Sequence, residues 1–380
     1  MHVLLIPISY PNSYNRQSHV FFEEQARALS DYGLQVGVIA VIPVSFKQIW
    51  KQKRFDMGFV EEKRRHVMVY RYQFPSVPFM RRLNSRLQTW LGKRLFLKYQ
   101  QHMGNPDIAH VHVSLGGRLA LWLNDAFQLP FVVTEHYTSF TRGNMPSWQK
   151  DIAQRVFSVS KRNIAVSNEF KARLERDFGG DFEYIPNIVD TNFFVPRRQE
   201  NSGQPARNFL NVGNLKPQKS QDILIRAFAS SFREKSDYKL IIAGSGPEES
   251  RLKKIASSLE MKNDIIFYGQ ADRDEVVKLM QQCDCFVLSS TYETFGVVVI
   301  EALSCGIPVI ATRSGGPESI ITDEELGILC DIDETQLSKA MTQLSKARYN
   351  SDNIREYAVT NFSPNVIAQD ITTIYKKALN

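Results

Sequence analysis

Residues 285–312, CFVLSSTYETFGVVVIEALSCGIPVIAT, indicate the architecture of the chain because they contain a predicted strand, helix and second strand in succession. The apolar run Cys285–Leu288 predicts a buried strand, and Pro308–Ala311 predicts another. Between them, Phe295–Cys305 has the length of a helix and is apolar enough to be buried nearly all round. A helix joining two short apolar strands indicates a βαβ unit within a parallel sheet.

The same alternation of short apolar runs and helical stretches continues along the chain. In the half that contains this stretch, strands are predicted at Phe209–Val212, Lys239–Ala243 and Ile265–Tyr268, with helices at Ser220–Ser231, Pro247–Leu259 and Arg273–Gln281. In the other half, strands are predicted at Val3–Ile8, Val36–Ile42, Ile108–Val113, Phe131–Thr134 and Asn163–Val166, with a helix at Phe21–Tyr32. The pattern predicts an α/β protein with two Rossmann-like, doubly wound domains.

The domain boundary is expected in the segment 196–208, which is rich in Pro, Arg, Gln, Asn and Ser. A chain of 380 residues also exceeds what one core usually organises. We therefore expect an N-terminal domain at 1–195 that faces a C-terminal domain at 196–362 across a cleft. The last segment, 363–380, contains a predicted helix at Asn365–Leu379 that is expected to pack back on the first domain.

Composition places the chain among globular proteins, with 43% hydrophobic and 23% charged residues. No apolar run is long enough for a membrane span, and Met1–Ile8 lacks the features of a signal peptide, so a cytoplasmic location is expected. Four cysteines lie in the second half without the spacing of a zinc site, which predicts reduced, buried thiols. Asp331 and Asp333 resemble a metal-binding pair, but Asp333 with Gln336 fits a helix N-cap better, so no metal is expected.

The basic residues are unevenly distributed. The formal net charge is +7, and the segment Lys63–Pro106 contains no Asp or Glu, which indicates an anionic partner. Within it, the apolar residues Met80, Leu83, Leu87, Trp90 and Leu91 alternate at helical intervals with Arg81, Arg82, Arg86, Lys93 and Arg94. Such a helix suits an anionic membrane surface, or else packs its apolar stripe on its own domain. A nucleic-acid partner is disfavoured, because no recognisable binding module with exposed stacking aromatics is present.

Candidate binding residues follow the strand that ends near Ser289. Glu293 lies in the loop, and Gly296 is expected in the first turn of the helix, whose free N–H groups can bind an anion or sugar hydroxyls. Glu301 lies six residues into the predicted helix, about 9 Å along its axis. Either carboxylate alone would more often be a solvated surface group. In a buried helix, however, a carboxylate needs a partner, and two of them suit an extended ligand such as a nucleotide-sugar.

Glu293 and Glu301, with Phe295-Gly296 between them and Ala302-Leu303-Ser304-Cys305-Gly306-Ile307-Pro308-Val309 after them, resemble the signature of family 4 retaining glycosyltransferases of the GT-B fold. The resemblance implies a hexosyltransferase-type enzyme that uses a nucleotide-diphosphate-sugar and needs no metal or other cofactor. It implies that Glu293 contacts the sugar's hydroxyls and that Glu301 binds the ribose. The backbone at Phe295, Gly296 and Val297 would hold the same sugar.

The resemblance extends to three turns of the second half. Gly213 and Asn214 lie in a turn that carries Lys219, the position of the family's diphosphate-binding lysine, although Asn214 stands where many members have Arg. Gly244 and Ser245 suit close approach to a ligand, and Gln270 matches the nucleobase edge. Gly315-Gly316-Pro317-Glu318 resembles the family's next glycine loop.

In the first half, His136 ends a strand and resembles the family histidine near the sugar donor and acceptor. His110 and His112 share one face of the preceding strand and are expected to pack behind it. Arg16, in the loop after the first strand, is a candidate to replace the cation missing at Asn214. His19 stands where that loop usually carries a glycine.

The mechanism implied is transfer with retained configuration, in which Lys219 and helix N–H groups stabilise the departing diphosphate and Glu293 and His136 position the sugar. The acceptor is expected to be a lipid-linked saccharide of cell-surface polysaccharide biosynthesis, met peripherally at the inner face of the membrane. A nucleotide-sugar epimerase or a phosphorylase on the same fold remains the alternative.

Overall fold

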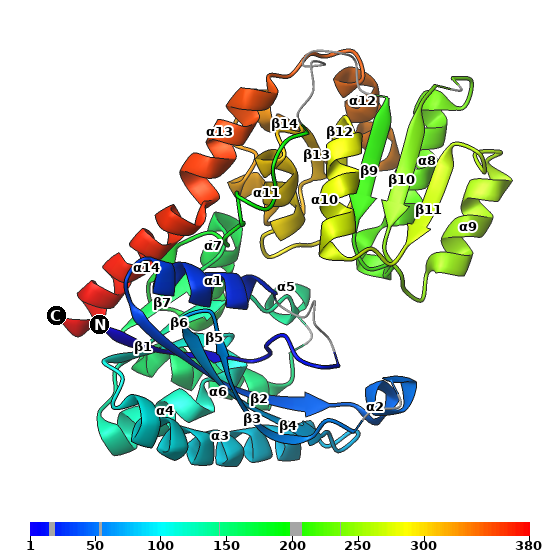
Figure 1. The fold of residues 1–380 in the computed structure, drawn as a ribbon. Coiled ribbons are helices and arrows are strands. Elements are labelled where there is room, and N and C mark those ends of the chain that lie inside the picture. The colour runs from blue at the N-terminus through cyan, green and yellow to red at the C-terminus, as the bar shows by residue number, and fades with distance from the viewer. Residues whose placement is uncertain (15–19, 53–54, 144, 198–206, 236) are drawn as a thin grey trace. The chain divides into compact units, whose positions relative to one another are not determined.

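The computed structural model describes the chain except residues 15–19, 53–54, 144, 198–206 and 236 (Figure 1). It divides into two compact units. Unit 1 contains Met1–Val166, Lys171–Ile188 and Pro364–Asn380, and unit 2 contains Ser167–Phe170 and Val189–Ser363. The main passage between the units therefore lies at Ile188 and Val189, a few residues before the linker-like segment.

Unit 1 is built on an eight-stranded sheet in the order β3-β4-β2-β1-β5-β6-β7-β8. The strands are β1 (His2–Pro7), β2 (Gln35–Val44), β3 (Gly58–Arg64), β4 (Val67–Pro75), β5 (Ile108–His112), β6 (Phe131–Glu135), β7 (Arg162–Ala165) and β8 (Phe182–Tyr184). All neighbours pair in parallel except β3, which runs antiparallel to β4 at the edge. The central strands β1, β5 and β6 are buried along their whole length, which explains their continuous apolar sequences.

The helices of unit 1 lie mostly over this sheet, whereas α2 (Phe46–Gln52) lies beyond the end of β2 (Figure 1). They are α1 (Val20–Asp31), α2, α3 (Arg81–Met103), the short 3₁₀ turn η1 (Ser114–Gly116), α4 (Arg118–Phe127), α5 (Ser139–Arg142), α6 (Ser147–Val159), α7 (Asn168–Phe178) and α14 (Pro364–Leu379). α14 packs against α1 and contributes Ile367, Ile371 and Tyr375 to the core that includes β1 and β2. The core of unit 1 is thus completed by a helix from the far end of the sequence.

Unit 2 is a six-stranded, fully parallel sheet in the order β11-β10-β9-β12-β13-β14. The strands are β9 (Asn208–Val212), β10 (Lys239–Ala243), β11 (Ile265–Gly269), β12 (Cys285–Leu288), β13 (Val309–Thr312) and β14 (Gly327–Cys330). The helices are η2 (Pro217–Lys219), α8 (Gln221–Phe232), α9 (Glu249–Ser258), α10 (Arg273–Gln282), α11 (Val297–Ser304), η3 (Pro317–Ser319), η4 (Glu324–Leu326), α12 (Glu334–Leu344) and α13 (Ser351–Phe362). The doubly wound α/β prediction is confirmed for each unit.

The β3–β4 hairpin was not expected from the sequence. It occupies residues 58–75, so part of the basic segment is sheet rather than helix. Arg71 is buried and bonds to Glu62, while Arg64 bonds to Glu23. These two arginines are therefore internally neutralised and do not belong to a free basic surface.

Two smaller predictions are confirmed. The Asp333 side chain accepts hydrogen bonds from the backbone N–H groups of Thr335 and Gln336, as an N-cap does. All four cysteines are buried free thiols, and burial raises the pKa of Cys305 and of Cys330 to about 12. Among the described residues, no helix combines the length and the apolar character that crossing a membrane requires.

Candidate functional site

In unit 2, two loops at the carboxyl edge of the sheet are joined by hydrogen bonds. The loop after β12 binds the η2 turn, because Thr291 N donates to Gln218 O at 2.9 Å and Ser289 Oγ donates to Lys219 O at 2.8 Å. Ligands of open α/β sheets bind at this carboxyl edge. The two loops therefore position their side chains where a ligand is expected.

These bonds bring Lys219 and Glu293 together across 74 residues of sequence. Lys219 Nζ lies 2.5 Å from Glu293 Oε1, and Ser290 Oγ donates to the same oxygen at 2.7 Å. Their side chains are 24% and 12% exposed, so the ion pair is partly shielded from water. Two of the three residues predicted to be catalytic thus contact each other directly.

The helix after this loop begins later than the sequence indicated. α11 starts at Val297, with Gly296 as its N-cap in the left-handed region at φ 102°. Glycine has no side chain that could cap the helix, and Val299 N donates to Gly296 O at 2.8 Å, so the N–H groups of Val297 and Val298 are those that a ligand can receive. Glu301 lies four residues into α11, so its axial distance from the helix start is about 6 Å rather than 9 Å.

As expected, α11 is buried nearly all round, and none of its residues is fully exposed. Val297, Val298 and Glu301 are each half-buried, while Val299 and Ile300 are buried. Residues at positions i and i+4 of a helix lie on one face, so Glu301 shares its face with Val297. A carboxylate and the open first turn of the helix are therefore presented on the same side.

The glycine turns after β9 and β10 are closely packed. A Cβ at Gly244 would lie 1.9 Å from Gly213 O, and one at Gly246 would lie 2.1 Å from Leu215 O. Side chains at Gly244 and Gly246 would therefore force the two turns apart. Close packing of the two turns therefore explains why glycine occupies both positions.

The polar residues beside these turns lie at the surface. Ser245 Oγ donates to Gln270 Oε1 at 2.7 Å, which joins two residues predicted to bind the sugar donor. Asn214 is exposed, so its position is open to solvent and to a ligand.

The loop after β13 completes this edge of unit 2. Gly315 N donates to both carboxylate oxygens of Glu318, at 3.1 and 2.9 Å, and Glu293 N donates to Ser314 O at 2.8 Å. A Cβ at Gly316 would meet Phe295 O at 2.4 Å. The loop that carries Glu293 and Phe295 is thus fixed from the side of β13 as well as by η2.

In unit 1, His136 follows β6 and is held by a buried carboxylate that the sequence did not single out. Glu135 Oε1 accepts hydrogen bonds from the backbone N–H groups of His136 and Tyr137, and its Oε2 accepts from the backbone N and the Oγ of Ser114. Burial raises the pKa of Glu135, and these four bonds oppose that shift. Glu135 therefore joins η1 to the loop that begins with His136. Its position beside His136 at a strand end was the available signal.

Behind His136 lies a row of imidazoles. His112 Nδ1 is 3.3 Å from His136 Nε2, the rings of His110 and His112 are stacked at 4.3 Å, and His110 bonds to Tyr375 and Thr134 at 2.7 Å each. Burial lowers the pKa of His110 to about 3 and that of His112 well below its ordinary value, so both are neutral at pH 7. His110 and His112 accordingly pack behind His136, as expected.

Two predicted features need separate mention. Arg16 and His19 lie outside the described residues. Among the residues that the structure describes, no group of three or more His, Cys, Asp or Glu side chains is arranged to hold a metal ion.

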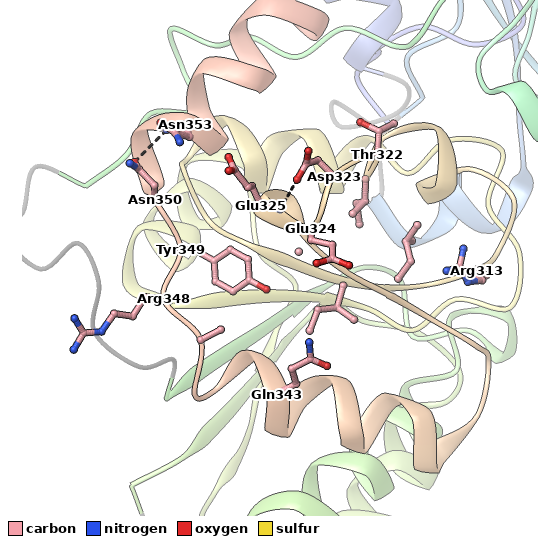
Figure 2. A pocket seen from close by; sticks show the side chains of 15 residues that line it. Arg313, Thr322, Asp323, Glu324, Glu325, Gln343, Arg348, Tyr349, Asn350 and Asn353 are labelled. Carbon is pink, nitrogen blue, oxygen red and sulfur yellow. Dashed lines mark hydrogen bonds between the residues drawn. The ribbon is translucent and has the colours of Figure 1, made fainter.

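Figure 2 shows a pocket of about 600 Å³ in unit 2. It lies along the edge strand β14, and none of the predicted site residues lines it. Several of its polar side chains serve as local caps: Asp323 accepts from Glu325 N, and Asn350 accepts from Asp352 N and Asn353 N. The pocket is therefore separate from the candidate site.

The arrangement in unit 2 suits an extended anionic ligand with hydroxyl groups. Lys219 and the open N-terminus of α11 supply positive charge and N–H donors, whereas Glu293 and Glu301 supply acceptors for hydroxyl groups. A nucleoside diphosphate joined to a sugar has both kinds of group.

Comparisons with known proteins agree with this chemistry. Residues 19–193 match the family described as Glycosyltransferase Family 4, and residues 195–360 match the family described as Glycosyl transferases group 1. An uncharacterized glycosyltransferase of Methanocaldococcus jannaschii is 30% identical over 72% of this chain and 76% of its own length. N-acetyl-alpha-D-glucosaminyl L-malate synthase of Bacillus anthracis is 27% identical over the same shares. A D-inositol 3-phosphate glycosyltransferase of Arthrobacter is 29% identical, but the match spans only 61% of that relative.

Solved structures share the fold. Sucrose-phosphate synthase from Thermosynechococcus elongatus superposes with a TM-score of 0.80 at 20% identity, over 99% of this chain and 98% of that one. HepE from Anabaena, solved in complex with UDP and glucose, gives a TM-score of 0.73 at 20% identity, over 99% of each chain. The prediction of the GT-B fold is confirmed.

Proposed function

This chain belongs to the group 1 glycosyltransferases, family 4 of the retaining GT-B enzymes, which transfer a sugar from a nucleotide-sugar donor, and we propose that its acceptor is a lipid-linked saccharide at an anionic membrane surface. The product would be a longer saccharide in cell-surface polysaccharide biosynthesis. Two parts of the chain support the proposal: the Lys219–Glu293 contact beside α11 for the sugar donor, and the basic face of α3 for the acceptor's membrane.

For the sugar donor, we assign the diphosphate to Lys219 and to the first N–H groups of α11. Glu293 would receive the sugar's hydroxyl groups and Glu301 those of the ribose. Because Lys219 pairs with Glu293 at 2.5 Å, a bound sugar donor would exchange their partners: the diphosphate would bind the lysine, and the sugar's hydroxyl groups would bind the carboxylate. Gly213, Gly244 and the adjoining turns would line the nucleotide side.

The reaction would proceed on one face of the sugar. The bond from the anomeric carbon to the phosphate oxygen breaks while a bond to the acceptor oxygen forms on the same face, and the leaving phosphate accepts the acceptor's proton. A nucleoside diphosphate is released. Lys219 and the N–H groups stabilise the charge that develops on the leaving group, so the site as assigned draws its positive charge from the protein. From unit 1, His136 would contact the sugar or the acceptor.

The basic face of α3 supports a membrane-bound acceptor. The apolar residues of α3 do not all face solvent. Leu91 is buried within unit 1, and Leu83 and Leu87 are half-buried, so these three leucines pack on their own domain. Trp90 remains exposed, and Arg94 lies over its ring at 4.0 Å from the centroid.

The exposed side of α3 thus mixes charge with one aromatic ring. Arg82, Arg86, Trp90 and Arg94 are exposed at intervals of four residues, which places them on one helix face. Basic side chains beside a tryptophan suit the headgroup region of an anionic membrane.

The test measures nucleoside diphosphate released from a panel of nucleotide-sugars. A lipid-linked saccharide is presented in anionic vesicles and compared with the same saccharide without its lipid. We expect release with the first acceptor and little with the second, and equal release with both would refute the lipid-linked acceptor. A failure to release nucleoside diphosphate with any acceptor, with the nucleotide-sugar epimerised or a sugar phosphate formed from inorganic phosphate instead, would favour an epimerase or a phosphorylase on the same fold.

Membrane binding is tested separately by co-sedimentation with vesicles at low and high salt. The variant Arg82→Gln/Arg86→Gln/Arg94→Gln should lose salt-sensitive binding to anionic vesicles, since each basic side chain near such a surface contributes about 1 kcal/mol. The matched control changes the exposed lysines Lys254, Lys262 and Lys278 of unit 2 to Gln. Equal loss in both variants would mean that only net charge matters.

A further inference from the structure

A second surface of unit 1 exposes large aromatic side chains to solvent. It consists of Phe46 and Trp50 of α2, Phe55 before β3, and Phe79 after β4. Trp50 is 86% exposed, Phe55 73% and Phe46 53%, and Phe79 is fully exposed. Large aromatic side chains gathered in the open usually mark an interaction site.

These four residues lie on three segments that adjoin the same end of the sheet: the segments after β2 and after β4, and the segment before β3. Strands β2 and β4 pair in parallel up to Val44 and Pro75, and Ser76 N donates to Val44 O at 2.8 Å, so the segments that carry Phe46 and Phe79 leave the sheet side by side. Strand β3 begins opposite Gln73, whose side chain donates to Asp56 O. Phe55 therefore joins the same edge.

α2 is attached through its other side. Ile49 packs against the core of unit 1, while Phe46 and Trp50, four residues apart, share a face that points away from it. Lys47 and Lys51 are exposed next to that face, and the segment 45–52 contains no acidic residue. The surface therefore combines rings with positive charge, as membrane-interfacial segments do.

Its position also suits the proposed reaction. The carboxyl ends of β2, β1, β5 and β6 lie at one edge of the sheet, and the loop that carries His136 starts at the end of β6. Three strand spacings separate β2 from β6, which is about 14 Å across the sheet. The strand registers place Thr134 of β6 level with Ala40 of β2, so β2 runs four residues, or about 13 Å, further before α2 begins. A saccharide extending from a lipid held near α2 would have to span roughly 20 Å to reach the loop of His136.

We propose that Phe46, Trp50, Phe55 and Phe79 form a membrane-insertion surface that enters the interface of an anionic bilayer beside the acceptor's lipid. This inference rests on the proposed lipid-linked acceptor, and it adds an apolar contact to the electrostatic one made by α3. Salt screens the attraction between α3 and an anionic membrane, but it does not weaken apolar insertion, so the two contacts differ in the salt dependence of membrane binding.

The experiment compares vesicle binding of the wild type with two double variants, Phe46→Ser/Trp50→Ser and Phe55→Ser/Phe79→Ser. At high salt, charge attraction is screened. Each double variant should then bind vesicles at least about tenfold more weakly, because it loses the free energy of transferring two aromatic side chains from water into the bilayer. Trp50→Phe keeps the apolar ring and should keep binding, whereas Trp50→Ser should not. The control is Tyr268→Ser, which removes a 43% exposed ring from unit 2.

The outcomes separate this inference from the proposed function. Folding of unit 1 in each variant is checked by its circular dichroism spectrum and its thermal unfolding, and folding of unit 2 by its stabilisation with nucleotide-sugar. If the aromatic variants bind vesicles as the wild type does at high salt, the insertion surface is refuted, whatever the acceptor. If they lose binding but the acceptor proves to be a free saccharide, the surface stands and the lipid-linked acceptor falls.

Discussion

Replacing Glu293 with Gln should strengthen the binding of a nucleoside diphosphate while it abolishes most sugar transfer. Glu293 is the ion-pair partner of Lys219 at 2.5 Å. A diphosphate without a sugar must compete with this carboxylate for the lysine and offers nothing to Glu293 in return. Glutamine has the same shape without the charge, so it should leave Lys219 available to the phosphates.

The size of the effect follows from the burial of the pair. Exposed ion pairs contribute about 0.2–1 kcal/mol, and breaking a fully buried one costs about 3–5 kcal/mol. With side chains 24% and 12% exposed, this pair lies between the two limits. We expect about 1–2 kcal/mol, or roughly 5- to 30-fold tighter binding of the diphosphate. Turnover should fall by about 100-fold or more, because the contact to the reacting sugar is weakened.

Calorimetric titration with nucleoside diphosphates measures the first effect, and release of nucleoside diphosphate from the intact sugar donor measures the second. Lys219→Met should weaken diphosphate binding, and adding Glu293→Gln to it should give no further gain. The control is Glu324→Gln, an exposed carboxylate beside the pocket of Figure 2. Unchanged or weaker diphosphate binding by Glu293→Gln would refute the exchange of partners.

Activity should survive excess EDTA, since the charges assigned to the leaving group are protein groups, and a loss restored by Mg²⁺ or Mn²⁺ would contradict this. If Arg16 supplies the cation that is missing at Asn214, Arg16→Ala should weaken sugar-donor binding and Asn214→Arg should tighten it by on the order of tenfold. Calorimetry that shows unchanged binding in both variants would refute this role of Arg16. Gly246→Ala places a Cβ 2.1 Å from Leu215 O and should cost about 1–3 kcal/mol in urea unfolding. Because the pKa of His110 is about 3 in the folded protein and 6.5 when unfolded, stability should fall as pH drops from 6.5 towards 3, by about 1.4 kcal/mol per pH unit, and His110→Asn should flatten that slope.

The sequence predicted the central strands well because a strand buried on both faces must be apolar throughout, as β5 and β12 are. Strand β3 was not predicted because an edge strand needs no continuous apolar run, and its residues alternate between half-buried and exposed. Its Lys63 and Arg64, and Arg71 of β4, were interpreted only as part of a basic segment.

The residue types of the site were predictable, but their contacts were not. Spacing placed Glu293 at a strand end, yet its pairing with Lys219 depends on hydrogen bonds between two loops 74 residues apart. The role of Glu135 was hidden because a carboxylate in an apolar strand end looks exposed until its four donors are known. The split of the α3 stripe depends on which leucines reach the core, which periodicity alone does not decide.

The membership of α14 in unit 1 has a consequence for how the chain is made. Its residues Ile367, Ile371 and Tyr375 fill a core whose other members precede residue 189. A ribosome adding about 5–20 residues per second needs roughly 9 to 35 s to pass through the intervening segment 189–363. During that time unit 1 has been translated, but its core lacks the side chains of α14. Unit 2 is nearly continuous in sequence and can fold while it leaves the ribosome. Unit 2 should therefore fold first, and unit 1 should complete its core only after α14 has been translated.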